Sequence, residues 1–176
     1  MNRKILITGP PRCGKSTLIT QLIQYYHNKK YIIYGFLTPE IRERGNRIGF
    51  NILDIYSEEQ SQLARIRNFK TKYRVGKYNI FIEDFDKYLK TSLNLEGKTF
   101  NMIIIDEIGK MELFSKFFQN FIKTIFSSRK TIIATIGLKL QHPLKNYLIN
   151  LPSIHLLNLN RQNSRLIFEK VISLIP

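Results

Sequence analysis

Residues 9–16 read Gly9-Pro10-Pro11-Arg12-Cys13-Gly14-Lys15-Ser16 and match the pattern G-x-x-x-x-G-K-[ST] at every position. A buried strand is expected just before this stretch, because residues 4–8 form a short, largely apolar run. An amphipathic helix is expected just after it, with an apolar face formed by Leu18, Ile19, Leu22, Ile23 and Tyr26. A strand, a glycine-rich turn and a helix in this order predict a phosphate-binding loop.

Each polar position of this loop has a chemical reason. Gly9 and Gly14 let the backbone turn tightly and direct its N–H groups into one anion-sized hollow. The helix that begins there adds its N-terminal dipole. Lys15 is expected to reach the β and γ phosphates of a nucleotide, Ser16 to ligate Mg²⁺, and Thr17 to donate to the α-phosphate.

The middle of the loop is less determined by its chemistry. We include Pro10, Pro11, Arg12 and Cys13 among the nucleotide-binding residues because they belong to the loop backbone. Arg12 has two interpretations that the sequence leaves open, contact with a phosphate or exposure to solvent. Cys13 is interpreted as a small filler, with an oxidation-sensitive thiol as the alternative.

A second motif follows a very apolar strand. Met102-Ile103-Ile104-Ile105 is followed directly by Asp106 and Glu107. In an open parallel sheet, ligands bind beyond the carboxyl ends of the strands, where both the loop at Gly9 and Asp106 would fall. We therefore expect Asp106 to hold Mg²⁺ through water and Glu107 to polarise an attacking water molecule. Lys15 and Glu107 are the predicted catalytic residues.

Strand-like and helix-like segments alternate along nearly the whole chain. Strands are expected at 31–37, 78–82, 101–106, 131–136 and 154–159, and helices at 83–93, 114–126 and 142–148, with a closing helix near the C-terminus. The polar turn Arg42-Glu43-Arg44-Gly45-Asn46 predicts a β-hairpin excursion around 39–55. The expected fold is α/β: one three-layer P-loop domain over 1–176, with a mostly parallel sheet flanked by helices. The glutamate after the aspartate and the space between the motifs favour the division of P-loop proteins that inserts a strand between the two motif strands.

Composition limits the class of protein. The formal net charge is +15, which attracts polyanions, but the basic residues are spread along the chain. This spread favours solvated basic faces, and nucleic acid stays an alternative partner. The apolar runs are too short to span a bilayer, and the basic start followed by Ile5-Leu6-Ile7 is too short for a signal peptide. We expect a cytoplasmic monomer with no membrane segment.

Three stretches together resemble one family. They are Thr8 to Leu18 around the phosphate loop, Gly35-Phe36-Leu37-Thr38-Pro39-Glu40-Ile41-Arg42 with Arg47-Ile48-Gly49-Phe50, and Ile104-Ile105-Asp106-Glu107-Ile108-Gly109-Lys110-Met111-Glu112-Leu113. These are similar to the signatures of the thermophile-type nucleoside-triphosphatases, the family that includes a human cancer-related nucleoside-triphosphatase. The similarity runs from residue 3 to about residue 170.

The resemblance implies a RecA-like fold and slow Mg²⁺-dependent hydrolysis of ATP, GTP, CTP and UTP with little base selectivity. It also implies that Asn160 and Arg161, after the last strand, line the base or the phosphates. The chain departs from the family at Arg12 and Cys13, where Gly and Val are more usual, and at Gly137, where Ile-Pro would be usual. The loop after Gly137 is therefore not predicted by the resemblance.

Two features of the mechanism stay open at this point. An arginine finger accelerates hydrolysis by about 10³- to 10⁵-fold where one is present. Arg42, Arg44 and Arg47 are candidates, with solvent-facing turn charges as the equal alternative. A phosphate loop also serves small-molecule kinases and nucleic-acid-stimulated ATPases, so a nucleotide or nucleoside kinase and a nucleic-acid-stimulated ATPase remain alternatives to hydrolysis by water.

Overall fold

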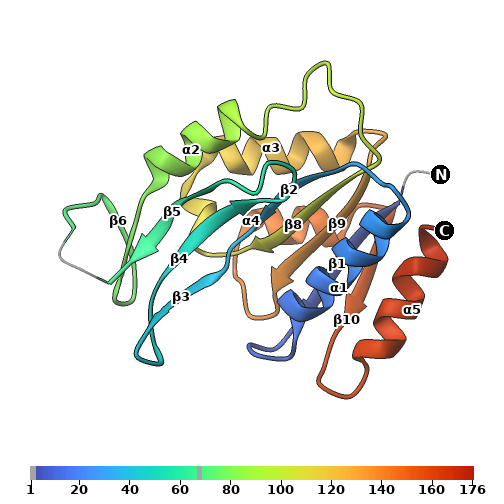
Figure 1. The fold of residues 1–176 in the computed structure, drawn as a ribbon, viewed down its shortest axis with the longest axis horizontal. Helices are drawn as coiled ribbons and strands as arrows, with labels where there is room; N and C mark the ends of the chain where they lie inside the picture. The colour runs from blue at the N-terminus through green and yellow to red at the C-terminus, as the bar shows by residue number, and fades with distance from the viewer. Residues whose placement is uncertain (1–2, 67–68) are drawn as a thin grey trace.

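A ten-stranded mixed sheet forms the centre of this computed structural model, which describes residues 3–66 and 69–176 (Figure 1). Residues 1–2 of the basic start lie outside the described part. The strand order is β10-β1-β9-β8-β2-β4-β5-β7-β6, and β3 pairs with β4. The strands are β1 (Lys4–Gly9), β2 (Ile33–Leu37), β3 (Glu40–Glu43), β4 (Asn46–Asp54), β5 (Gln60–Arg65), β6 (Tyr73–Val75), β7 (Tyr78–Ile80), β8 (Met102–Ile108), β9 (Thr131–Gly137) and β10 (Ile154–Asn158).

The half of the sheet from β10 to β2 is parallel throughout. Strand β9 lies between β1, which leads into the phosphate loop, and β8, which carries the two acids. This order confirms the predicted inserted strand. Because all five strands run the same way, the carboxyl ends of β1, β8 and β9 meet at one edge.

The other half is antiparallel and contains the predicted hairpin. Strands β3 and β4 are joined by Arg44 and Gly45, both at positive φ (48° and 79°), as a tight hairpin turn requires. Strand β4 also pairs with β2, so the hairpin extends the main sheet. Strands β5 and β6 were not predicted from the sequence, and they widen the sheet beyond the predicted parallel core.

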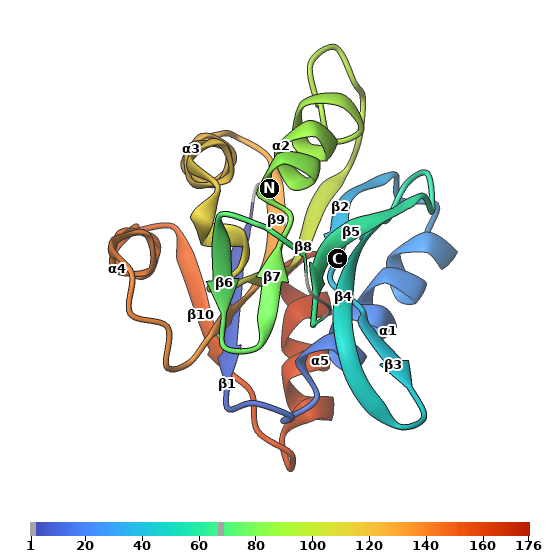
Figure 2. The same cartoon turned by 90° about the vertical axis from the view of Figure 1, so that its left-hand side faces the viewer.

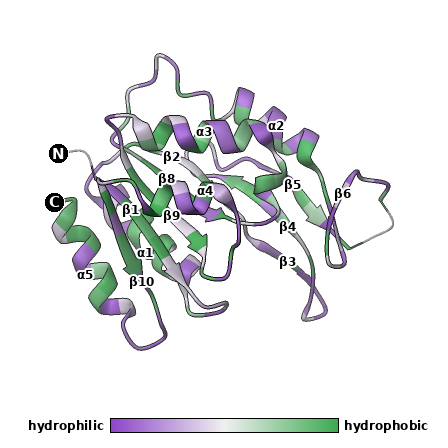
Figure 3. Ribbon diagram, turned by 180° about the vertical axis from the view of Figure 1, so that it is seen from behind, coloured by the Kyte–Doolittle hydropathy of each residue, from purple (hydrophilic) through white to green (hydrophobic). Residues whose placement is uncertain are grey.

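Helices cover both faces of the sheet and give the predicted three layers (Figures 1 and 2). The helices α1 (Lys15–Asn28) and α5 (Ser164–Leu174) pack on one face, and α2 (Ile82–Thr91), α3 (Lys116–Ser127) and α4 (Pro143–Ile149) pack on the other. A short 3₁₀ helix, η1 (Glu112–Phe114), links β8 to α3. The parallel strands are hydrophobic along most of their length (Figure 3), as burial on both faces requires.

Side-chain caps explain where two of these helices begin. Ser115 Oγ accepts a hydrogen bond from the Phe118 backbone N–H at 2.8 Å and starts α3. His142 Nδ1 accepts from the Leu144 N–H at 3.1 Å, and Pro143 occupies the first turn of α4. The predicted aromatic stripe is confirmed as core packing, since Phe118, Ile122, Ile125 and Phe126 are buried.

The edge of the sheet opposite the phosphate loop is held by a buried lysine. The Lys4 ammonium donates to the carbonyl oxygens of Ile125, Ser128 and Lys130, at 3.1, 2.7 and 2.6 Å. Burial lowers the pKa of Lys4 to about 8. These contacts join β1 to the C-terminal end of α3, where free carbonyl groups attract cations.

No helix in residues 3–66 and 69–176 is long and apolar enough to cross a membrane.

Candidate functional site

The phosphate loop connects β1 to α1 at the carboxyl edge of the sheet. A Cβ atom at Gly9 would lie 2.4 Å from the Leu159 carbonyl oxygen and 2.7 Å from Cys13 Sγ, so only glycine fits there. Gly14 has φ of 100°, a conformation that side chains disfavour. The buried Cys13 thiol fills the inside of the loop.

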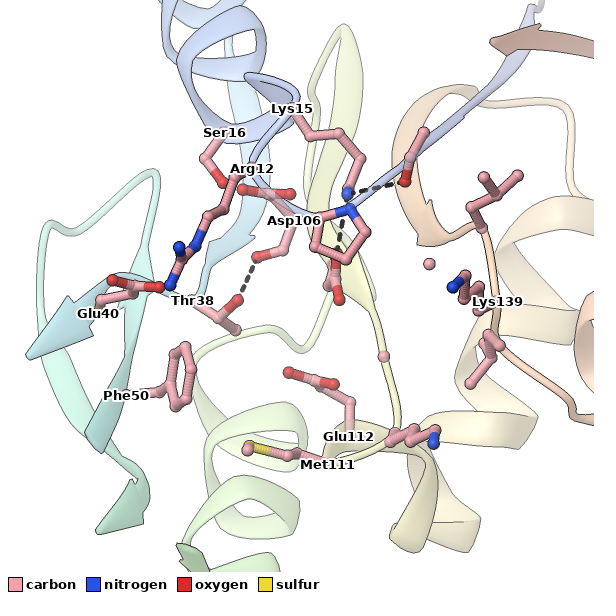
Figure 4. A pocket seen from close by; sticks show the side chains of 18 of the residues that line it. Arg12, Lys15, Ser16, Thr38, Glu40, Phe50, Asp106, Met111, Glu112 and Lys139 are labelled. Carbon is pink, nitrogen blue, oxygen red and sulfur yellow. Dashed lines mark hydrogen bonds and ion pairs between the residues drawn. The ribbon is translucent and has the colours of Figure 1, made fainter. Parts of the chain in front are cut away.

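Lys15 and Glu107 face one another across this edge. The Lys15 ammonium donates to the Gly9 carbonyl oxygen at 3.3 Å and lies 4.0 Å from Glu107 Oε2 (Figure 4). The Lys15 side chain is 12% exposed and that of Glu107 is 36% exposed. Both groups therefore stand at the wall of a cavity where a phosphate can reach them.

A bulge in β8 positions the two acids. The register with β9 shifts between Ile105 and Ile108, so β8 carries one more residue than its neighbour over this interval. Bulges of this kind redirect side chains near functional sites. Asp106 is 4% exposed; its Oδ1 accepts a hydrogen bond from the Thr135 hydroxyl, and its carbonyl accepts one from the Thr38 hydroxyl at 2.9 Å.

The surroundings of Glu107 act on its proton affinity in two directions. Burial raises the pKa of Glu107 above that of an ordinary glutamate, and neighbouring Asp106 raises it further. The Lys15 ammonium lowers it. A carboxylate with this environment is a suitable acceptor for the proton of a water molecule near neutral pH.

A third acid, Glu112, lies at the floor of the cavity. Burial and the charge of Glu107 raise its pKa to about 8. The two carboxylates meet at Gly109, because a Cβ atom there would lie 2.7 Å from Glu112 Oε2 and 3.0 Å from Glu107 Oε1. Glu112 thus supports the wall next to Glu107 in its uncharged form at neutral pH.

All these groups open into one cavity of about 910 Å³. Its walls come from the phosphate loop, the β3–β4 hairpin, the end of β8 and the turn after β9; the lining residues are Gly9, Pro11, Arg12, Gly14, Lys15, Ser16, Thr17, Thr38, Glu40, Arg47, Phe50, Val75, Asp106, Glu107, Gly109, Lys110, Met111, Glu112, Gly137, Leu138, Lys139 and Leu140. The structure therefore brings the phosphate-loop residues, Asp106 and Glu107 together.

The three finger candidates differ in position. Arg42 donates to Glu40 Oε2 at 3.1 and 2.6 Å and to the Gly45 carbonyl. Arg47 donates to Glu40 Oε1 at 2.7 Å and to the Tyr78 hydroxyl at 2.8 Å. Of Arg42, Arg44 and Arg47, only Arg47 lines the cavity. A finger role for any of them stays a prediction.

Asn160 and Arg161 lie outside the lining of this cavity. Asn160 Oδ1 accepts from the backbone N–H groups of Gln162 and Asn163, at 2.8 and 3.0 Å. The Asn160 side chain therefore organises the turn that precedes α5. Their contact with a base or phosphate stays a prediction.

The oxygen atoms of the site suit a divalent cation. Ser16, Asp106 and Glu107 line the same cavity, and hydroxyl and carboxylate oxygens are what Mg²⁺ prefers, completed by phosphates and water. Within the described residues, no group of three His, Cys, Asp or Glu side chains forms a site by itself. This donor set thus fits an ion that arrives with a nucleotide.

Several cavity residues were not predicted as part of the site: Thr38, Glu40, Phe50, Glu112, Thr135 and Lys139. Thr135 gave one signal, a hydroxyl near the end of an apolar strand expected to lie beside the acids. The others lie in segments whose position depends on pairings distant in sequence.

The NTPase family model matches residues 4–172. The nucleoside-triphosphatase THEP1 of Thermotoga maritima is 38% identical over 172 residues, which cover 98% of this chain and 95% of the relative. The corresponding protein of Methanocaldococcus jannaschii is 33% identical, over 98% and 96%. The chain belongs to this NTPase family.

Solved structures agree with this assignment. THEP1 from Aquifex aeolicus superposes with a TM-score of 0.79 at 31% identity, covering 97% of this chain and 98% of that one. A human cancer-related nucleoside triphosphatase superposes with a TM-score of 0.82 at 28% identity, covering 98% and 97%. The α/β fold and the family predicted from the sequence are confirmed, and the NTPase is a hydrolase of the nucleotide-binding P-loop class.

Proposed function

We propose that this NTPase slowly hydrolyses Mg-bound ATP, GTP, CTP and UTP to the diphosphate and inorganic phosphate. The observation that carries the proposal is the pairing of Lys15 and Glu107, 4.0 Å apart, on the wall of one cavity. A phosphate-binding cation and a carboxylate able to accept a proton are thereby placed on either side of the position where a γ-phosphoryl group would lie.

The residues divide the chemistry among them. The backbone N–H groups of the phosphate loop and Lys15 would hold the phosphates. Ser16, and Asp106 through water, would hold Mg²⁺, which when bound supplies positive charge to the phosphate oxygens. Glu107 would orient a water molecule and accept its proton as the water oxygen bonds to the γ-phosphorus and the bond to the β–γ bridging oxygen breaks.

Slow turnover and broad base specificity each have a structural argument. The nearest finger candidate, Arg47, is already held by Glu40 and Tyr78, and absence of a finger leaves P-loop hydrolysis slow. The polar lining of the cavity surrounds the phosphates, and Asn160 and Arg161 lie outside it. We therefore expect the site to read the triphosphate more than the base.

Phosphate release from the four nucleotides, with Mg²⁺ and with EDTA, tests this proposal. We expect comparable slow turnover of all four with Mg²⁺ and none with EDTA, and loss of turnover in Lys15→Ala. Fast release in EDTA, or full activity of Lys15→Ala, would refute the proposal.

A kinase is the second candidate, favoured by one feature of the cavity. Its far side is lined by Phe50, Val75 and Met111, apolar groups that phosphates and water do not need and that a ring-bearing acceptor would contact. In that case nucleosides or nucleoside monophosphates added with ATP should accelerate ADP formation and receive the labelled γ-phosphoryl group. Unchanged ADP formation with all label in free phosphate would leave hydrolysis as the activity.

A further inference from the structure

The turn at residues 137–140 overhangs the phosphate loop. Gly137, the last residue of β9, is the register partner of Gly9, the first residue of the loop. Because β9 lies between β1 and β8, the turn starts between Lys15 on one side and Glu107 on the other. A side chain carried by this turn therefore projects over the position expected for the γ-phosphoryl group.

Hydrogen bonds fix the shape of this turn. The Leu140 N–H donates to the Gly137 carbonyl at 3.1 Å and closes the turn. The Lys145 ammonium, from α4, donates to the carbonyls of Gly137 and Leu138 at 3.1 and 2.5 Å. Lys139 sits inside this braced turn, and Figure 4 shows its side chain directed into the cavity from the side opposite Glu40 and Phe50.

Five cationic residues line the cavity in the described part of the chain, and they differ in what already binds them: Arg12, Lys15, Arg47, Lys110 and Lys139. Lys15 is next to Glu107, and Arg47 is paired with Glu40. Lys110 also lines a second cavity with Leu113 and Phe114. Arg12 belongs to the phosphate loop itself and points toward Glu40 in Figure 4.

Lys139 is the remaining cation. No ion pair or hydrogen bond to its ammonium is found in residues 3–66 and 69–176, and the residue is exposed. It lines this cavity and does not line the second one. A cation on a rigid turn with its charge uncompensated is suited to bind an incoming anion.

We propose that Lys139 is a further catalytic residue, which contacts the γ-phosphoryl oxygens of a bound nucleoside triphosphate. There it would stabilise the charge that an arginine finger supplies in other P-loop hydrolases. The inference rests on the proposed function, because it requires a triphosphate in this cavity.

Affinities for ATP and ADP measured in EDTA test the contact without metal and without turnover. A charged hydrogen bond to one phosphoryl group changes affinity by about 10- to 100-fold. We expect Lys139→Ala to lower the preference for ATP over ADP by this factor with ADP affinity unchanged, and Lys139→Arg to restore most of it. Lys170→Ala, on the exposed face of α5, matches the change in net charge and should leave the preference unaltered.

Each other outcome has a distinct meaning. An unchanged ATP preference in Lys139→Ala, or a loss found in Lys110→Ala instead, would overturn the assignment to Lys139. If the wild-type protein binds ATP no better than ADP, the γ-phosphoryl contact does not exist and the inference also fails. Wild-type protein that binds neither nucleotide, with or without Mg²⁺, would overturn the proposed function itself. With Mg²⁺, kcat should fall by about 10- to 100-fold in Lys139→Ala while KM changes less.

Discussion

The Thr135 hydroxyl, on β9, donates a hydrogen bond to Oδ1 of Asp106, on the neighbouring β8. It leaves Oδ2 free to face the cavity and fixes the orientation of a carboxylate that would otherwise rotate. Partners that orient a metal-binding carboxylate typically contribute about 10- to 100-fold to metal affinity or activity.

We therefore expect Thr135→Val to raise the Mg²⁺ concentration required for half-maximal phosphate release by about tenfold or more. Thr135→Ser keeps the hydroxyl and should stay close to wild type. Magnesium titrations of phosphate release would compare the three proteins. Equal magnesium requirements in Thr135→Val and wild type would show that this hydrogen bond does not orient a magnesium ligand.

Gly109 separates the carboxylates of Glu107 and Glu112, and a methyl group there would meet both. Because the ends of these side chains can move, we expect Gly109→Ala to displace Glu107 without unfolding the protein. Phosphate release should drop by about tenfold or more, whereas ATP affinity should hold, since misplacement of a reacting group by about 1 Å costs about 100-fold. Unaltered turnover would mean that the position of Glu107 tolerates the methyl group.

Glu112 predicts a specific pH dependence of stability. Its folded pKa of about 8 lies above the ordinary value of 4.5, so the folded state binds more protons than the unfolded state between these values. Stability should fall as pH rises through this window, by up to about 1.4 kcal/mol per pH unit from this group, and it should be complete below pH 4.5. Glu112→Gln removes the titration.

Urea unfolding at several pH values between 5 and 8 would measure this effect as the difference between the wild type and Glu112→Gln. The free energy of unfolding of the variant should gain on that of the wild type as pH rises. A constant difference across the window would show that Glu112 titrates normally.

Lys4 provides a stability prediction remote from the site. Lys4→Met removes the donor from three carbonyl groups, and a buried acceptor left without a partner costs about 1–3 kcal/mol. We expect a loss of about 2–4 kcal/mol in the free energy of unfolding, with ATP affinity retained. Lys170→Met should change stability by less than about 0.5 kcal/mol; a similarly small change in Lys4→Met would show that these bonds stabilise little.

The positions of the loop and the acids could be predicted because their motifs contain both the chemistry and the local structure. Apolar residues before Gly9 and before Asp106 indicate buried strands, and the ends of parallel strands meet at one edge. The inserted strand β9 followed from the spacing of the same motifs. These inferences required no knowledge of how distant segments pair.

The antiparallel half of the sheet could not be predicted in the same way. Gln60–Arg65 is polar along most of its length and Tyr73–Val75 is only three residues long, so neither shows a strong strand pattern. Lys139 joins the site through the register of β1 with β9. Glu112 does so because η1 folds back beneath Gly109. Nucleic-acid binding and the monomeric state stay predictions.

The central claim is that Glu107 activates the attacking water, and Glu107→Gln tests it most directly. Glutamine keeps the size of the side chain but cannot accept a proton. We predict that the variant binds ATP within several-fold of wild type and releases phosphate at least about 100-fold more slowly. Phosphate release at the wild-type rate, with ATP affinity unchanged, would contradict the claim.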